Sequence, residues 1–292
     1  MKRSLICFLI GCFAFSTANG QLLWEISGNH LKQKSYLLGT HHLVSASFLD
    51  SIPGVYKAFN RTQTVVGEIV ANDPKMIKKM TQAAKLPNYT SMNQLLSPTE
   101  YQQIDSALQV VTKITLAELA LLKPAMISNL YLISLYNRLY PTNNESWQID
   151  SFFQQVAAQK NRSVIGLESI EKQIDILFNS QSLERQAFLL VGAVETTNEM
   201  EHEIKTMNYL YKKGDLNGLL SLYINDTSKY AATQEEVFEI LDNRNQEWAK
   251  TIPQLIHQNP SFIAVGALHL PGESGLIALL RKAGYRVKPI KK

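Results

Sequence analysis

Two stretches far apart in the chain carry one pattern, Ser35-Tyr36-Leu37-Leu38-Gly39-Thr40-His41-His42-Leu43 and Ser261-Phe262-Ile263-Ala264-Val265-Gly266-Ala267-Leu268-His269-Leu270. In each, an apolar run typical of a buried strand leads into Gly-x-x-His-Leu. The glycine lets the chain turn sharply where the strand ends, and the histidine follows three residues later. Ligands of open α/β sheets bind beyond the carboxyl ends of the strands. We therefore predict that the two strands share one sheet and that His42 and His269 reach one site.

Further apolar segments at both ends of the chain predict the other strands of this sheet. They are residues 22–27, 64–70, 164–167 and 285–290. Residues 22–27 and the first motif strand are expected to form a hairpin. The predicted fold class is α/β (α+β), a mixed β-sheet formed by N- and C-terminal strands and surrounded by helices, with a large helical insertion.

The middle of the chain has the start signals of helices. Capping-box patterns stand at Ser97 and Glu100, at Thr115 and Glu118, and at Thr233 and Glu236. They predict a helix to Val111, a helix interrupted near Pro124, and a helix that ends near Gln258. Asp150 is expected to cap a helix that runs to Lys160, and residues 182–213 are expected to form one helix closed by Gly214.

Residues 1–20 have the composition of a secretory signal peptide. Lys2 and Arg3 precede an apolar run from Ile6 to Phe15, and Ala18-Asn19-Gly20 offers small residues for cleavage. Two alternatives stay open: a buried N-terminal element, and a lipobox at Leu9-Ile10-Gly11-Cys12 that would lipidate Cys12. The prediction is a signal peptide at 1–20, a single domain at 21–292, and a secreted or periplasmic location.

Composition narrows the class of protein. The chain is 45% hydrophobic and 18% charged, and it has no Gly/Ser/Pro-rich linker. Both cysteines, Cys7 and Cys12, lie in the segment expected to be removed, so the mature chain would have neither a disulfide nor a thiol nucleophile. Loss of that segment removes two basic residues and lowers the net charge from +4 to +2, which does not indicate a nucleic-acid partner.

The two motif histidines suggest a divalent metal site, for which a carboxylate is the usual third ligand. Glu68 is the best candidate, because it interrupts the apolar run Val65–Val70, where an unpaired carboxylate is costly. The alternatives are that both histidines only cap strand ends and that Glu68 points to a solvated face. Zinc, manganese, cobalt and iron are all compatible with these ligands.

Two further residues are candidates for catalysis. Glu168 follows the strand 164–167 and would be a general base or a partner of a ligand; alternatively, it is a charge at a helix N-terminus. Arg244 would stabilise an oxyanion, or it is a solvated helix charge. The remaining histidines are expected at the surface, namely His30, His41, His202 and His257.

At these residues the sequence resembles the TraB/GumN family, which includes the TIKI metalloproteases. The matching pieces are Leu23-Trp24, Tyr36–His42, Val65–Glu68, Ile149-Asp150, Gly166–Glu168 with Gln173, Tyr211 with Gly214-Asp215, Arg244-Asn245 with Trp248, and Val265–Gly272 with Gly284-Tyr285. They span nearly the whole chain after residue 20. Their order and spacing, more than any single piece, make the match specific.

The resemblance implies a fold like that of erythromycin-esterase and ChaN-like proteins, and metal-dependent hydrolysis. Carried over by residue, His42, Glu68 and His269 would bind the metal, and Glu168 and Arg244 would support catalysis. His41 is a departure, since family members often have an apolar residue there, which leaves open which adjacent histidine faces the site.

The leading hypothesis is therefore a metal-dependent peptidase or related amide or ester hydrolase that acts outside the cytoplasm on a peptide or similar substrate. The alternatives are a non-catalytic envelope protein that binds metal or haem, and an accessory protein of polysaccharide or envelope assembly. A membrane partner is expected only if Cys12 is lipidated, and the oligomeric state stays open.

Overall fold

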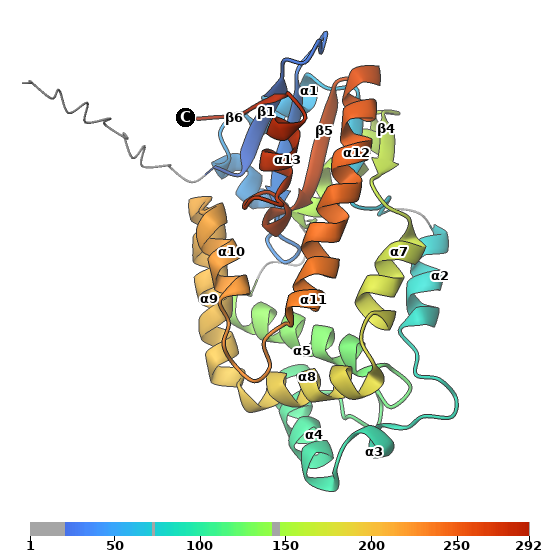
Figure 1. The fold of residues 1–292 in the computed structure, drawn as a ribbon. Helices are drawn as coiled ribbons and strands as arrows, with labels where there is room; N and C mark the ends of the chain where they lie inside the picture. Colours follow the sequence, from blue (N-terminus) through green and yellow to red (C-terminus); the bar gives the residue numbers. More distant parts are fainter. Residues whose placement is uncertain (1–20, 72–73, 142–146, 292) are drawn as a thin grey trace, which may run out of the picture.

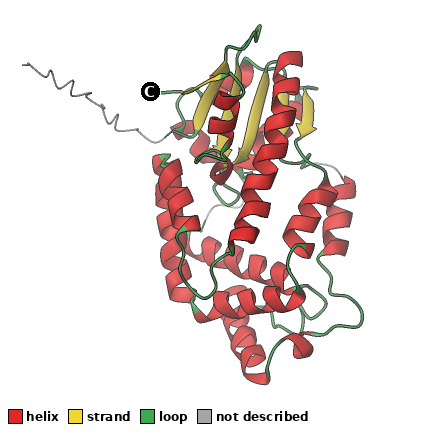
Figure 2. Ribbon diagram, in the orientation of Figure 1, coloured by secondary structure: helices red, strands yellow, loops and turns green. Residues whose placement is uncertain are grey.

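The computed structural model describes residues 21–71, 74–141 and 147–291, and a six-stranded mixed sheet surrounded by helices is its framework (Figures 1 and 2). The expected fold class is confirmed. The strands are β1 Leu23–Ser27, β2 Ser35–Thr40, β3 Thr64–Gly67, β4 Ser163–Gly166, β5 Ser261–Gly266 and β6 Arg286–Pro289. The signal peptide expected at 1–20, with Cys7 and Cys12, lies outside the described residues.

The strand order, β4-β3-β5-β2-β1-β6, brings the two motif strands together. β2 pairs in parallel with β5, so that Tyr36 lies opposite Phe262 and Thr40 opposite Gly266. β3 and β4 continue the parallel half, whereas β1 is antiparallel to β2, as the hairpin prediction required, and β6 is antiparallel to β1. Because parallel strands end at the same edge, both Gly-x-x-His motifs emerge there side by side.

The third strand, β3, is shorter than expected, and Glu68 lies just beyond its end. β3 stops at Gly67 instead of residue 70, so Glu68 is the first residue beyond the strand. A Cβ atom at Gly67 would lie 2.2 Å from Gln154 Nε2, and Gln154 in turn binds the backbone of Ile69 and Ala71. The missing side chain thus lets α6 approach while the chain leaves the sheet.

The helices form a layer on the sheet and a larger helical part below it in Figure 1. Their bounds are α1 Val55–Asn60, α2 Pro74–Ala83, α3 Met92–Leu95, α4 Pro98–Thr112, α5 Pro124–Leu139, α6 Ile149–Gln159, α7 Ile170–Ile174, α8 Leu183–Glu195, α9 Thr197–Lys213, α10 Leu216–Ile224, α11 Gln234–Val237, α12 Asn243–Gln258 and α13 Leu276–Lys282. One cluster of buried apolar side chains surrounds the sheet and a second lies among α4, α5 and α8. That residues 21–292 form a single domain stays a prediction.

The helix predictions need four corrections. The expected helix 182–213 is divided at Thr196 into α8 and α9; the Thr196 hydroxyl donates to the backbone oxygen of Gly192, a local bond that competes with helix continuation. Asp150 lies inside the first turn of α6, and Gln148 is the N-cap. Thr115 and Glu118 make their capping bonds, but only a turn follows before α5.

The fourth correction concerns the expected helix up to Gln258. It contains a π-helical segment, Phe238–Asp242, between α11 and α12, and a second π-helical segment, Asp175–Asn179, follows α7. π-Helical turns are rare and often occur at functional sites.

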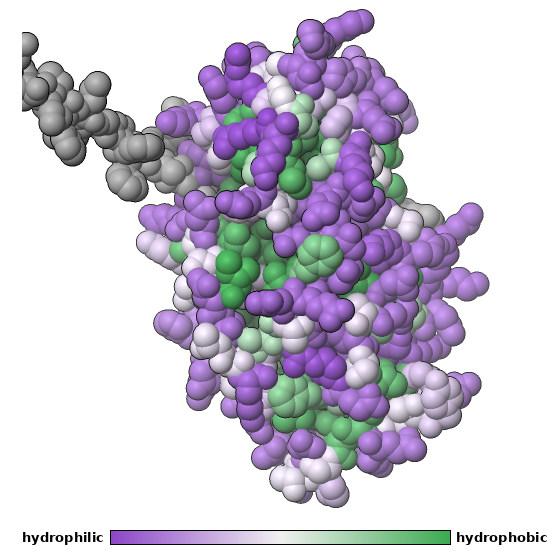
Figure 3. Space-filling model, viewed as in Figure 1, coloured by the Kyte–Doolittle hydropathy of each residue, from purple (hydrophilic) through white to green (hydrophobic). Residues whose placement is uncertain are grey.

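The face shown in Figure 3 is mostly hydrophilic, with apolar side chains gathered near the middle and the lower part of the molecule. Within the part of the chain that the structure describes, no helix has the length and apolar character needed to cross a membrane.

Candidate active site

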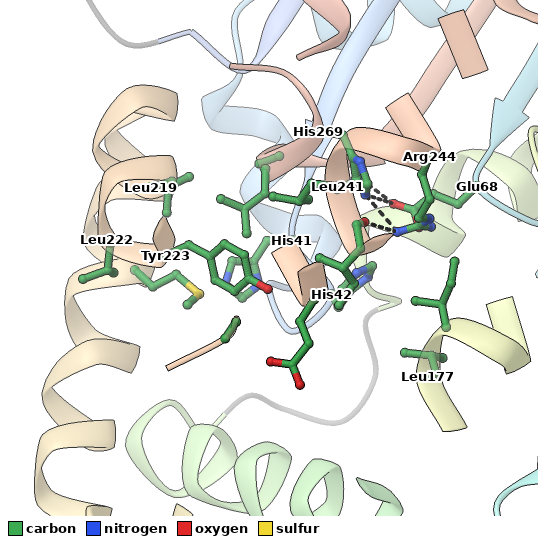
Figure 4. A pocket seen from close by; sticks show the side chains of 18 of the residues that line it. His41, His42, Glu68, Leu177, Leu219, Leu222, Tyr223, Leu241, Arg244 and His269 are labelled. Atoms are coloured by element: carbon green, nitrogen blue, oxygen red, sulfur yellow. Dashed lines mark hydrogen bonds and ion pairs between the residues drawn. The ribbon is translucent and has the colours of Figure 1, made fainter. Parts of the chain in front are cut away.

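A cavity of about 710 Å³ opens at the carboxyl edge of the parallel strands, between the sheet and the helical part. His42, Glu68, Arg244 and His269 all line it (Figure 4). β2, β3, α12 and β5 deliver these four residues, so the sheet order unites groups that are distant in sequence.

The Arg244 guanidinium forms the centre of the charged cluster. Its Nη2 lies 2.6 Å from Glu68 Oε2 and 2.7 Å from Glu168 Oε1, and its Nε donates to Glu168 Oε2 at 3.1 Å. The two bonds to Glu168 have the bidentate geometry of a strong arginine–carboxylate pair. Arg244 is buried and lies over the Trp248 ring. The alternative that Arg244 is a solvated charge on a helix is therefore wrong.

Glu68 is held as a carboxylate. The backbone N–H of Gly266 donates to its Oε1 at 2.8 Å. Burial alone would raise the pKa of Glu68, but His269, Arg244 and His42 outweigh burial and hold this pKa at about 2. The Glu68 side chain is only 12% exposed. The alternative that Glu68 points to a solvated face is therefore wrong.

The hydrogen-bond partners of His269 assign its tautomer. Asn245 Nδ2 donates to the Ser274 carbonyl, which turns Asn245 Oδ1 toward His269 Nδ1 at 2.8 Å. His269 therefore donates from Nδ1, and its Nε2 accepts from Arg244 Nη1 at 3.0 Å. Burial lowers the pKa of His269 to about 3, so the imidazole is neutral and the permanent cation beside Glu68 is Arg244.

His42 forms a second charged unit on the same cavity. Its Nδ1 lies 3.1 Å from Asp150 Oδ2, and the Thr40 hydroxyl donates to the other Asp150 oxygen. The negative charge of Asp150 raises the pKa of His42 to about 9. The side chain is 71% exposed, and Nε2 has no hydrogen-bond partner among the residues described.

His41 differs from the expected surface histidine, whereas His30, His202 and His257 are exposed as predicted. Its Nδ1 accepts from the Leu43 N–H at 3.1 Å, and its ring packs against Tyr211 and Tyr136. Burial, and then the charge of His42, lower the pKa of His41 to about 4. His41 therefore supports the turn after β2 while it lines the cavity.

Of the five predicted site residues, His42, Glu68, Arg244 and His269 line one cavity and Glu168 binds Arg244. The structure also shows partners that the sequence did not predict. Asp150 pairs with His42 across 108 residues, and Asn245 orients His269. Gln173 Nε2 lies 3.5 Å from Glu68 Oε2 and 3.4 Å from Glu168 Oε1. Asp150 and Gln173 occur among the family-like pieces of the sequence, but no local spacing indicates these contacts.

The cluster is arranged around the arginine. Within residues 21–71, 74–141 and 147–291, no three or more His, Cys, Asp or Glu side chains are grouped in a way that could hold a metal ion. The metal-ligand roles of His42, Glu68 and His269, and the catalytic roles of Glu168 and Arg244, stay predictions.

Comparison of the sequence with known proteins identifies its family. The model of the TraB/PrgY/gumN family matches residues 22–289. Metalloprotease TIKI2 of Danio rerio is 25% identical over 317 residues, and Metalloprotease TIKI1 of Xenopus tropicalis is 24% identical over 322 residues. A Metalloprotease TIKI homolog of Nematostella vectensis is 24% identical over 309 residues.

These alignments cover most of this chain but less of the relatives. They include 91%, 91% and 88% of this chain, and 60%, 60% and 65% of the respective relatives. The chain thus spans about three fifths of the length of these proteins. No solved structure matches the chain.

Proposed function

This chain belongs to the TraB/PrgY/gumN family, and on that premise we propose that it is a hydrolase that cleaves peptide or related amide or ester bonds with the help of a divalent metal ion. The observation that carries the proposal is the convergence of His42 and His269, from the two Gly-x-x-His motifs, with Glu68 on one cavity. The relatives named metalloproteases support the same class of reaction. We further propose that the protein acts outside the cytoplasm.

The donor atoms are of the types that a divalent ion accepts, but the cluster would have to rearrange to hold one. Neutral His269, ionised Glu68 and Nε2 of His42, once that atom has lost its proton, are the nitrogen and oxygen donors that zinc, manganese, cobalt and iron accept. The Nε2 atom of His269, however, has a single lone pair, and Arg244 occupies it. Use of His269 as a ligand therefore requires that Arg244 move from this atom.

A bound ion would acidify a water molecule and polarise the carbonyl group of the substrate. The chain's own residues supply the rest. Glu168 and Gln173 hold Arg244 and Glu68 in place. All N–H groups of Arg244 are engaged, so the guanidinium would stabilise an oxyanion in the cavity only after it releases one of its partners. Glu168, which is 6% exposed, acts here by positioning Arg244.

The His42–Asp150 pair supports a second, metal-free route to the same hydrolysis. A histidine oriented by a carboxylate through Nδ1, with Nε2 free, is a common arrangement for proton transfer. With its pKa near 9, His42 is protonated at neutral pH. Water would attack the carbonyl carbon and the C–N bond would break, with Nε2 giving its proton to the leaving amine and the attacking water returning a proton to His42. Arg244 would stabilise the oxyanion in this route also.

One set of measurements tests the proposal and separates the two routes. Peptide mixtures would be incubated with purified protein, with and without chelator, and metal content would be determined for the wild type, Glu68→Gln and His269→Ala. The metal route predicts bound metal, its loss in both variants, and inhibition by chelator. The metal-free route predicts activity that survives chelation and is lost in Asp150→Asn.

Absence of cleavage by the wild type under both conditions would contradict the proposal. Reconstitution with haem is the companion experiment, since a Soret band that is lost in His42→Ala would support the non-catalytic binding alternative instead.

A further inference from the structure

The cavity is chemically two-sided. The charged cluster lies at the sheet edge, whereas much of the remaining lining is apolar. In Figure 4 the side chains of Leu219, Leu222 and Tyr223, all from α10, lie away from Arg244 and His269. We call the apolar part the apolar wall; it consists of Leu177, Met207, Leu219, Leu222, Tyr223 and Leu241.

The two π-helical segments contribute to this wall. Leu177 belongs to the segment Asp175–Asn179, and Leu241 belongs to the segment Phe238–Asp242. A π-turn accommodates an additional residue in a helical turn and thereby changes where the side chains point. Both π-helical segments thus contribute side chains to the same cavity.

Tyr223 adds one polar atom to the apolar wall. Its hydroxyl has no hydrogen-bond partner in the part of the chain that the structure describes, and burial raises the pKa of this phenol. Tyr223 is half-buried and lines the cavity, so its hydroxyl is accessible to a ligand there. The free hydroxyl can therefore donate to a polar group of a ligand that rests on the wall.

The cavity has the size and composition of a ligand site. Its volume of about 710 Å³ lies inside the range of roughly 300–1,000 Å³ that is typical of mostly apolar pockets with a few polar groups. Carboxylates of Glu203, Asp226 and Glu236 also line it, but Arg185 binds Glu236, and Ser228 donates to Asp226. Glu203 has no hydrogen-bond or ion-pair partner among the described residues, so the lining is not wholly apolar, although most of its surface is.

We propose that the apolar wall is a specificity subsite for a large apolar group of the substrate, and that Leu222 and Tyr223 are its specificity-determining residues. The group is an aliphatic or aromatic side chain, or an acyl chain. The placement of the scissile bond at the sheet edge rests on the proposed hydrolase function, but binding of an apolar group to the wall does not.

Binding of the neutral fluorophore N-phenyl-1-naphthylamine tests the subsite without catalysis. We expect saturable fluorescence enhancement with the wild type. Leu222→Asp would leave a carboxylate against the apolar ligand and should weaken binding on the order of tenfold, and Leu222→Asn should have a smaller effect in the same direction. Leu121→Asp, the same change at an exposed leucine outside the cavity, is the matched control and should bind like the wild type.

Competition identifies the group that the wall accepts. Acetyl-Phe-Leu-Phe-amide carries apolar side chains, and N-octanoyl-Gly-Gly-amide carries an acyl chain. Displacement of the fluorophore by either compound supports the subsite and shows which kind of apolar group it binds. Tyr223→Phe should weaken both competitors while it leaves the fluorophore, which does not need the hydroxyl, unaffected. Equal displacement by acetyl-Lys-Ser-Lys-amide, or unchanged fluorophore binding in both Leu222 variants, would overturn the proposal.

A different result would contradict the hydrolase proposal. Specific fluorophore binding without cleavage of any peptide by the wild type would leave the subsite intact and refute the hydrolase. If cleavage occurs, the cut peptides should carry a large apolar group near the scissile bond, and Leu222→Asp should raise KM for them more than it lowers kcat.

Discussion

Arg244 is the residue on which the charged cluster depends. It compensates two buried carboxylates and contacts His269. Among the described residues, its ion-pair partners are Glu68 and Glu168 alone. A buried ion pair adds little net stability compared with an apolar packing, but removal of one partner is expensive because the other charge is stranded. The cluster is thus stable only as a complete unit.

The first prediction follows at this scale. Arg244→Met should lower the free energy of unfolding by roughly 3 kcal/mol at pH 7, since Glu68 and Glu168 lose their cation. The loss should be smaller at pH 5, because the two adjacent carboxyls in the variant can share a proton. Urea unfolding at both pH values measures the effect. Arg138→Met, at an exposed pair with Glu201, is the control and should cost about 1 kcal/mol or less.

The second prediction concerns His42 in metal-free protein. Because its pKa is raised to about 9 in the folded state, its pairing with Asp150 stabilises the fold fully below pH 6.5, the ordinary value, and this contribution disappears as pH rises to 9. In Asp150→Asn the pKa should fall toward 6.5 and the pH dependence in this window should flatten. Titration of the imidazole protons by NMR, with chelator present, provides the measurement; an unchanged pKa would contradict the pairing.

At the scale of elements, one ion pair connects α8 to the start of α11. Arg185 donates to both oxygens of Glu236 at 2.9 Å and also to the Ala231 carbonyl. Gln181 donates to Glu236 as well. Glu236 lines the cavity, so these bonds hold the segment that leads to α11 against the helical part.

The third prediction is acid sensitivity from this contact. The hydrogen bond from Arg185 holds the pKa of Glu236 at about 2 against the opposing effect of burial. The Arg185–Glu236 ion pair therefore stabilises the fold above pH 4.5, the ordinary pKa of the carboxyl group, and this stabilisation is lost as pH falls toward 2. Glu236→Gln should therefore cost about 1–2 kcal/mol at pH 7 and nothing near pH 2. Thermal unfolding from pH 2 to 7 tests this; a cost that does not vary with pH would argue against an ionic contribution.

At the scale of the whole molecule, the fourth prediction concerns export. The basic start and apolar run of residues 1–20 lead us to expect an N-terminus near Gln21, or a lipidated Cys12, in protein isolated from cells. Intact-mass measurement of material from the cell envelope and from the medium would detect either form. Recovery of the chain with Met1 in place would contradict it.

The sequence by itself determined the features that act over a few residues. The apolar runs into Gly-x-x-His predicted where β2 and β5 end, and capping boxes predicted the starts of α4 and α11. These signals depend on backbone geometry and side-chain bonds within one turn, so they can be recognised without a partner segment. The family match and the candidate site residues also rested on such local pieces.

Only the tertiary structure decided which of these residues meet, and how. The pairing of His42 with Asp150, the position of Arg244 between Glu68 and Glu168, and the tautomer of His269 join atoms from different elements. The apolar wall likewise combines α9, α10 and two π-helical segments. Strand order and helix packing set these contacts through the summed burial of many side chains, and no spacing along the chain records that sum.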